Sequence, residues 1–166
     1  SVSMALAMTA CGASGETRAQ MEAVLARGIT FDELLTGMST MQQKMQENQK
    51  VTTQVANSLW LRQSAIRLEE TFLRNNEEYF GSVVYERPFN NQTLEEINAW
   101  VSDHTGGMIP SILKEIDSAT VMYLINALYF EAQWREPYRY VAEGTFTTAD
   151  GTVRQVETLR SSESYY

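Results

Sequence analysis

Residues 120–130, TVMYLINALYF, form the stretch that decides the fold. Their β-branched, aromatic and long apolar side chains favour a long strand. Apolar residues follow one another almost without a break, so both faces of such a strand are apolar. Strands of this kind lie between covering layers, because neither face can be left to water. We therefore predict a central strand that other parts of the chain cover on both sides.

One polar residue, Asn126, interrupts this run. A buried amide without hydrogen-bond partners costs about 1–3 kcal/mol, so we expect other groups to bond it. The residues alone leave three interpretations open. Asn126 is an ordinary core asparagine with satisfied bonds, a mild irregularity of the strand, or part of a functional polar site.

Helical patterns dominate the N-terminal half. Residues 2–12 are apolar on nearly every side, which predicts a helix enclosed by protein. Thr17, Thr30 and Thr93 each stand three residues before Gln or Glu, a capping-box pattern that predicts a helix start. We expect the first of these helices to run to Arg27, with Gly28 as its stop. The second should turn a stripe of apolar side chains toward the core, formed by Leu34, Met38, Met41 and Met45. The third should close at Gly106-Gly107.

Strand and turn signals account for most of the remaining chain. We predict a strand over residues 51–62, a helix over 67–80 and a short strand over 82–86. The Asp150-Gly151 pair indicates the turn of a final hairpin. Helices that come early and strands that are scattered predict the α+β fold class.

Composition excludes several classes of function. Hydrophobic residues make up 43% and charged residues 20% of the 166 residues, as in an ordinary globular domain. The formal net charge of -8 makes nucleic acid and anionic membranes improbable partners. The single cysteine, Cys11, rules out an intrachain disulfide. One histidine and one cysteine also make a metal site improbable.

Five segments, taken in order, resemble the serpin family. Residues 124–138, LINALYFEAQWREPY, are similar to the serpin signature of an Asn-bearing strand followed by an aromatic pair, a tryptophan, and Pro with an aromatic residue. The residues that carry it are Asn126, Tyr129, Phe130, Trp134, Pro137 and Tyr138. The other matching segments are SVSMALAMTACGASGETRAQ (1–20), VANSLWLRQSAIRLEETF (55–72), INAWVSDHTGGMI (97–109) and FTTADGTVRQVETL (146–159). Because the match is collinear along nearly the whole chain, it is more specific than any one motif.

The resemblance implies a partial serpin fold, with N-terminal helices and strands of a large central sheet. It also implies a single incomplete domain over residues 1–166, truncated at both ends and lacking the reactive-centre loop. Ser1 and Asn126 match family positions of the shutter, the polar cluster that holds the sheet closed. Trp134 matches the breach, where insertion of the loop begins. The rest of the shutter, notably a histidine, is expected outside this sequence.

The family likeness further implies an inhibitor and not an enzyme. We expect a suicide substrate that traps a serine protease, with cysteine proteases as the other class, by inserting its cleaved loop into the central sheet. The alternative is a non-inhibitory serpin that acts as a carrier or chaperone. Secretion to the extracellular space follows from family habit alone. No cofactor is expected.

Two local features could indicate a catalytic site or a heparin site. His104 stands beside Ser102 and Asp103, but neighbours on one helix cannot converge as a catalytic triad. An α+β hydrolase with a chance likeness is therefore the least favoured reading. Lys44 and Lys50 are the only basic residues in the stretch where some serpins bind heparin, so no strong heparin site is expected. The chain also departs from the family pattern with Glu131-Ala132-Gln133, where Lys-Gly-Lys is common.

Overall fold

The computed structural model describes residues 1–47, 51–134, 138 and 140–160. Lys50 and Pro137, which entered the sequence analysis, lie outside these residues. The chain divides into two compact units, residues 1–131 and 132–166, which are described separately. In chain order the elements are α1 (Val2–Ala10), α2 (Gly15–Leu25), α3 (Phe31–Gln46), β1 (Val51–Arg62), α4 (Glu70–Phe80), β2 (Val83–Arg87), α5 (Asn91–His104), β3 (Met122–Ala132), β4 (Tyr140–Thr147) and β5 (Val153–Arg160).

A three-stranded sheet of order β2-β1-β3 organises the first unit. β1 and β2 run parallel, with Ser58 opposite Val83, and α4 makes the crossover between them. β3 runs antiparallel to β1: Arg62 at the end of β1 donates its backbone N–H to the carbonyl of Val121, the residue just before β3. The predicted strand over 120–130 is thus the outer strand beside β1, with β1 at the centre.

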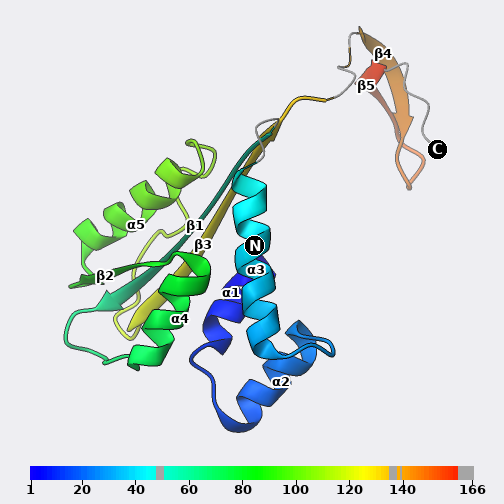
Figure 1. Ribbon diagram of the computed structural model, residues 1–166. Coiled ribbons are helices and arrows are strands. Elements are labelled where there is room, and N and C mark those ends of the chain that lie inside the picture. Colours follow the sequence, from blue (N-terminus) through cyan, green and yellow to red (C-terminus); the bar gives the residue numbers. More distant parts are fainter. Residues whose placement is uncertain (48–50, 135–137, 139, 161–166) are drawn as a thin grey trace. The chain divides into compact units, whose positions relative to one another are not determined.

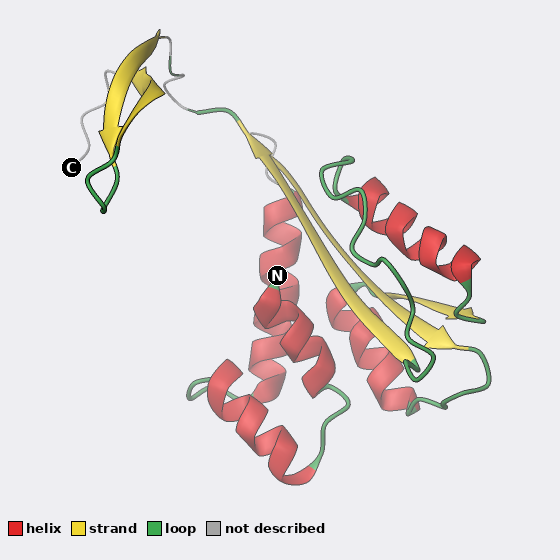
Figure 2. Cartoon of the chain, turned by 180° about the vertical axis from the view of Figure 1, so that it is seen from behind, coloured by secondary structure: helices red, strands yellow, loops and turns green. Residues whose placement is uncertain are grey.

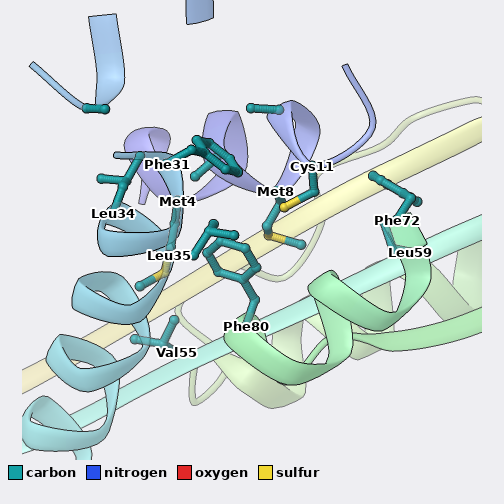
Figure 3. Packing of buried hydrophobic residues seen from close by; sticks show 13 residues of the cluster. Met4, Met8, Cys11, Phe31, Leu34, Leu35, Val55, Leu59, Phe72 and Phe80 are labelled. Atoms are coloured by element: carbon teal, nitrogen blue, oxygen red, sulfur yellow. The ribbon is translucent and has the colours of Figure 1, made fainter. Parts of the chain in front are cut away.

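Helices α1, α3 and α4 cover one face of this sheet (Figure 1). Their buried side chains meet Val55 and Leu59 of β1, and Figure 3 shows Met8, Leu35 and Phe80 converging over the two long strands. All three of these side chains are essentially inaccessible to water. Because this layer holds most of the large buried side chains of the first unit, it is the main core.

Helix α5 covers the opposite face, as the view from behind shows (Figure 2). Ile97, Trp100 and Val101 of α5 pack with Trp60 of β1 and Ile125 of β3. Trp60 also stacks on Tyr85 of β2, with ring centroids 4.2 Å apart. The prediction of a strand covered on both faces holds only in part: Ile125 and Ala127 are buried on the α5 face of β3, whereas Leu124 on the opposite face is only partly buried against the main core.

The ends of β3 and one side of α1 differ from the sequence expectation. Phe130 is 63% exposed and Val121 is 42% exposed, so the cover on the strand does not reach its ends. Helix α1 was expected to be enclosed, yet Val2 is 75% and Leu6 43% exposed. Within the described residues α1 has neighbours on one side only, which its uniform apolarity could not reveal.

The three expected capping boxes have different outcomes. Thr30 forms both bonds of the box with Glu33, as predicted, and α3 begins directly after it. The prediction at Thr17 is wrong, because Ser14 is the N-cap and Thr17 lies inside α2. The prediction at Thr93 is also wrong, because Asn90 caps α5 by accepting the Thr93 N–H. Both helices begin three residues earlier than the capping-box pattern places them, so each threonine lies inside a helix and not at its N-cap.

The other predicted boundaries shift by a few residues. β1 has the expected bounds, whereas the helix expected over 67–80 begins at Glu70 and the strand expected over 82–86 ends at Arg87. Helix α2 ends at Leu25, short of the expected Arg27, which itself takes the left-handed conformation at φ 44°. The second unit holds the predicted hairpin of β4 and β5, with Gly151 at φ 84° in its turn.

Candidate functional site

Asn126 lies in the middle of β3 and faces a second asparagine, Asn57 of β1. The Asn126 Nδ2 donates to Asn57 Oδ1 at 2.7 Å and lies 3.7 Å from the Met4 Sδ of α1. The antiparallel register brings the two residues opposite each other. We call Asn57 and Asn126 the amide pair.

Asn57 is the more deeply placed member of the amide pair. It is 2% exposed, and its Nδ2 donates to the backbone carbonyl of Phe80 at 2.7 Å. Both polar ends of this amide are therefore satisfied, which removes the cost of burying it. Bonds from α4 through β1 to β3 thus form one continuous chain across the main core.

The sequence analysis missed Asn57, although a signal was present. Residues 57–60, Asn-Ser-Leu-Trp, repeat the pattern of residues 126–129, Asn-Ala-Leu-Tyr: an asparagine, a small residue, Leu and an aromatic residue. Two polar residues in matching places of two apolar strands favour a cross-strand pair. Only the register of the strands turns this likeness into a contact.

One polar atom of the amide pair has no partner. The Asn126 Oδ1 is buried and accepts no hydrogen bond from any described residue. The Asn76 Oδ1 and the Ser82 Oγ near the end of α4 are in the same condition. An unpaired buried acceptor costs about 1–3 kcal/mol, so the Asn126 Oδ1 is a place where a further donor would stabilise the fold.

Beyond the amide pair, side chains of α5 and of Thr105 at its end hold the segment that leads into β3. The Asn98 Oδ1 accepts the backbone N–H groups of Ile112 and Leu113 at 2.9 and 3.0 Å, and its Nδ2 donates to the Leu113 carbonyl at 2.9 Å. Thr105 accepts the Ile109 N–H at 3.1 Å and donates to the Val101 carbonyl at 2.8 Å. Residues 106–121, here called the strap, are thereby tied to α5.

Comparison with known proteins identifies the fold. The model of the family described as Serpin (serine protease inhibitor) matches residues 1–166. The chain belongs to the serpin family. It is 34% identical to the leukocyte elastase inhibitor of Bos taurus over 153 residues, which cover 87% of this chain and 39% of that serpin. It is 28% identical to the corticosteroid-binding globulin of Pongo abelii, over 99% of this chain and 42% of that protein.

Solved serpin structures match the same portion. The thermophilic serpin tengpin in its latent state shares 38% identity and a TM-score of 0.85, over 95% of this chain and 43% of tengpin. In its native state tengpin gives 37% identity and a TM-score of 0.84, over 94% of this chain and 41% of tengpin. The chain thus spans about two fifths of the length of the relatives it matches, and that portion is N-terminal.

The structure brings together only part of the expected serpin site. Asn126 lies against Met4 of α1, and its role in a shutter stays a prediction. Ser1 is the exposed N-cap of α1, and its side chain makes no capping bond. The amide pair bonds Met4 of the same helix and not Ser1.

Trp134, the expected breach residue, belongs to the second unit. Its side chain is 70% exposed, and its ring meets that of Tyr138 edge-on at 5.9 Å. Along the chain it follows two residues after the end of β3. Whether it acts at the breach stays a prediction.

The other titratable candidates are held by local contacts. His104 stacks on Trp100 at 4.2 Å and its Nδ1 lies 2.7 Å from the Trp100 carbonyl, so its ring is not turned toward Ser102 or Asp103. Burial raises the pKa of the Cys11 thiol to about 11, which makes it a poor nucleophile. Within the described residues there is no group of three or more His, Cys, Asp or Glu side chains suited to a metal ion. No helix among them is long and apolar enough to cross a membrane.

Proposed function

We propose that this chain is the N-terminal part of a suicide-substrate inhibitor of serine proteases, with cysteine proteases as the second class. Protease inhibition is the activity that gives the serpin family its name. In this proposal β3 is the strand beside which the cleaved reactive loop inserts. The loop itself lies in the part of the protein outside residues 1–166, and the chain has no catalytic role.

The observation that carries the proposal is the position of β3. It is the outer strand of the described sheet and is 11 residues long, so one row of backbone N–H and C=O groups faces away from β1. An inserted strand would bond that row and the next strand, with about ten bonds at about 0.5–1.5 kcal/mol each. The resulting gain, on the order of 10 kcal/mol, suits a reaction that must not reverse.

The amide pair fits the proposed shutter, which must hold the sheet closed and later let a strand enter. A polar cluster at the middle of a sheet can exchange its bonds when a strand enters, whereas an apolar contact would only be lost. Ser1 and Asn126 remain the proposed shutter residues, and Trp134 the proposed breach residue. The near-equal TM-scores against tengpin in its latent and native states support a scaffold role for residues 1–166.

A second candidate function is that of a non-inhibitory carrier. It is favoured by the likeness to a corticosteroid-binding globulin, which at 28% identity is not far below the elastase inhibitor at 34%. The two functions differ in the hinge of the reactive loop, where small residues permit insertion. That hinge lies outside this chain.

One experiment separates these candidates. The complete natural protein would be incubated with trypsin-like and elastase-like serine proteases and with a papain-like cysteine protease, then run on a denaturing gel. An inhibitor gives a band at the summed mass of both proteins that survives detergent. A carrier gives only a cleaved product, and a hydrolase gives neither. Cleavage without a stable band for every protease would refute the inhibitor proposal.

The proposal also concerns location and cofactors. We propose an extracellular protein whose inhibition is not strongly accelerated by heparin. Helix α3 carries Lys44 as its only described base, whereas Asp32 and Glu33 fill its first turn. An acceleration by heparin of more than about tenfold at physiological salt would contradict this, because such steering needs a cluster of bases.

A further inference from the structure

The hydrogen bonds of the amide pair have a direction that starts at Phe80. A backbone carbonyl can only accept, so the Asn57 end that lies 2.7 Å from the Phe80 carbonyl must be its nitrogen. The Asn57 oxygen therefore faces Asn126, and the Asn126 end 2.7 Å away must be its nitrogen. The Asn126 oxygen is then directed away from Asn57.

A second contact supports the same orientation independently. The Asn126 Nδ2 lies 3.7 Å from the Met4 Sδ, and a thioether sulfur can accept a hydrogen bond but cannot donate one. Two acceptors on different elements, β1 and α1, thus both select the nitrogen. Rotating the Asn126 amide by half a turn would set its oxygen against two acceptors.

The starting point of this chain of bonds is rigid. Phe80 is 1% exposed and its ring packs among the side chains of α1 and α3 (Figure 3). Gly81 ends α4 in the left-handed conformation at φ 60°, and the Ser82 N–H bonds the Asn76 carbonyl at 3.1 Å. The Phe80 carbonyl is therefore held by both the helix end and the core.

We propose that Asn57 is a positioning residue of the shutter. It holds the Asn126 amide with its nitrogen toward β1, so the buried Asn126 oxygen is left to accept from a hydrogen-bond donor outside the described residues. Because Asn57 is on the central strand, with β2 and β3 on either side, it stays in place while the partner of that oxygen is exchanged. The functional half of this inference rests on the proposed loop insertion.

Asn76 supplies a matched control for testing this. Like Asn57 it is a fully buried asparagine, and its Nδ2 donates to the carbonyls of Met8 and Phe72. It makes no described contact with Asn126. Asn57→Leu and Asn76→Leu both remove a buried amide of similar volume from the same core, but only the first releases Asn126.

The structural test measures the side-chain NH₂ protons of Asn126 by NMR in the complete protein with ¹⁵N-labelled asparagine. Asn57→Leu should speed their exchange with solvent at least tenfold over the wild type, because it removes their 2.7 Å acceptor. Asn76→Leu should change this rate less than threefold at equal global stability. Equal effects of both variants would overturn the proposal.

Asn57→Asp keeps the test decisive if Asn57→Leu does not fold. A protonated carboxyl can donate to the Phe80 carbonyl and accept from Asn126, whereas a carboxylate can only accept. The described partners of the amide pair are Met4, the Phe80 carbonyl and each other, none of which ionises. The measured quantity is the exchange rate of the Asn126 NH₂ protons in Asn57→Asp, divided by the wild-type rate at the same pH. This ratio should therefore return toward one as the pH falls. A flat ratio would overturn the proposal.

The functional test is a double-mutant cycle on the rate constant of protease inhibition. If Asn57 acts through Asn126, Asn57→Leu should change this rate in the wild type but by less than twofold in an Asn126→Ala background. The effect of Asn76→Leu should persist in both backgrounds. If the wild type traps no protease, the proposed function fails while the NMR test still decides the role of Asn57. If it traps protease and the cycle shows no coupling, only the role of Asn57 fails.

Discussion

Replacing Asn98 by alanine would release the strap from α5. The side chain makes three hydrogen bonds to the strap, between 2.9 and 3.0 Å long, to the backbone of Ile112 and Leu113. At about 1 kcal/mol each these sum to about 3 kcal/mol. The bond to the Ile112 N–H is exposed and water replaces part of it, which leaves a net loss of about 2 kcal/mol.

The assay is native-state hydrogen exchange in the complete protein, read at the amides of Ile112 and Leu113. A loss of 2 kcal/mol in local stability corresponds to exchange about 30-fold faster. Asn91→Ala is the matched control, because Asn91 is an exposed asparagine in the first turn of the same helix with no described side-chain bond. It should change these rates less than twofold.

Two outcomes would refute this reasoning. If both variants leave the two amides equally protected, the strap is held by packing and not by Asn98. If Asn98→Ala speeds exchange throughout α5 as much as in the strap, the side chain stabilises the helix in general. The expected pattern is fast exchange confined to the strap.

Four further outcomes are expected. Cys11 should react with iodoacetamide at pH 8 at least about 100-fold more slowly in the native protein than in urea, because burial raises its pKa to about 11 from a usual value near 8.5. Trp60→Ala should lower the free energy of unfolding by about 3–5 kcal/mol in urea denaturation, whereas a loss under 1 kcal/mol would mean that the core collapses around the gap. Thr30→Ala should cost α3 about 1 kcal/mol of cap energy. The backbone N–H of Thr30, and then its hydroxyl, donate to Glu33 and hold the pKa of that carboxyl below its usual value, so it stabilises the fold above its ordinary range and the effect fades as the pH falls through the lowered pKa. Thr30→Ala keeps the backbone bond and removes the hydroxyl, so an NMR titration should find the pKa of Glu33 partly restored toward its usual value, and no change would contradict the hydroxyl bond. Finally, residues 1–166 expressed alone should associate through the outer edge of β3, and a monomeric, cooperatively melting product in size-exclusion chromatography and calorimetry would contradict that.

Where local physics decides, the sequence was a reliable guide to the structure. The strand over 51–62 and the capping box at Thr30 depend on side chains a few residues apart, and both appear as predicted. The order of serpin motifs likewise predicted the family before any coordinate was known. The choice between neighbouring N-caps was harder to predict, because Ser14 and Asn90 belong, with threonine, to the residue types favoured at that position.

By itself the sequence determined that a strand runs through residues 120–130, of which the structure buries only the middle, and that Asn126 within it needs a partner. Only the tertiary structure decided that this partner is Asn57, 69 residues away along the chain, and that no residue in the described part of the chain donates to the Asn126 oxygen. The reason is physical: periodicity reports which face of an element is apolar, but a hydrogen bond across a sheet depends on strand order and register. Strand order and register are set by the packing of both helical layers on β1 and β3, so no single segment of the sequence determines them.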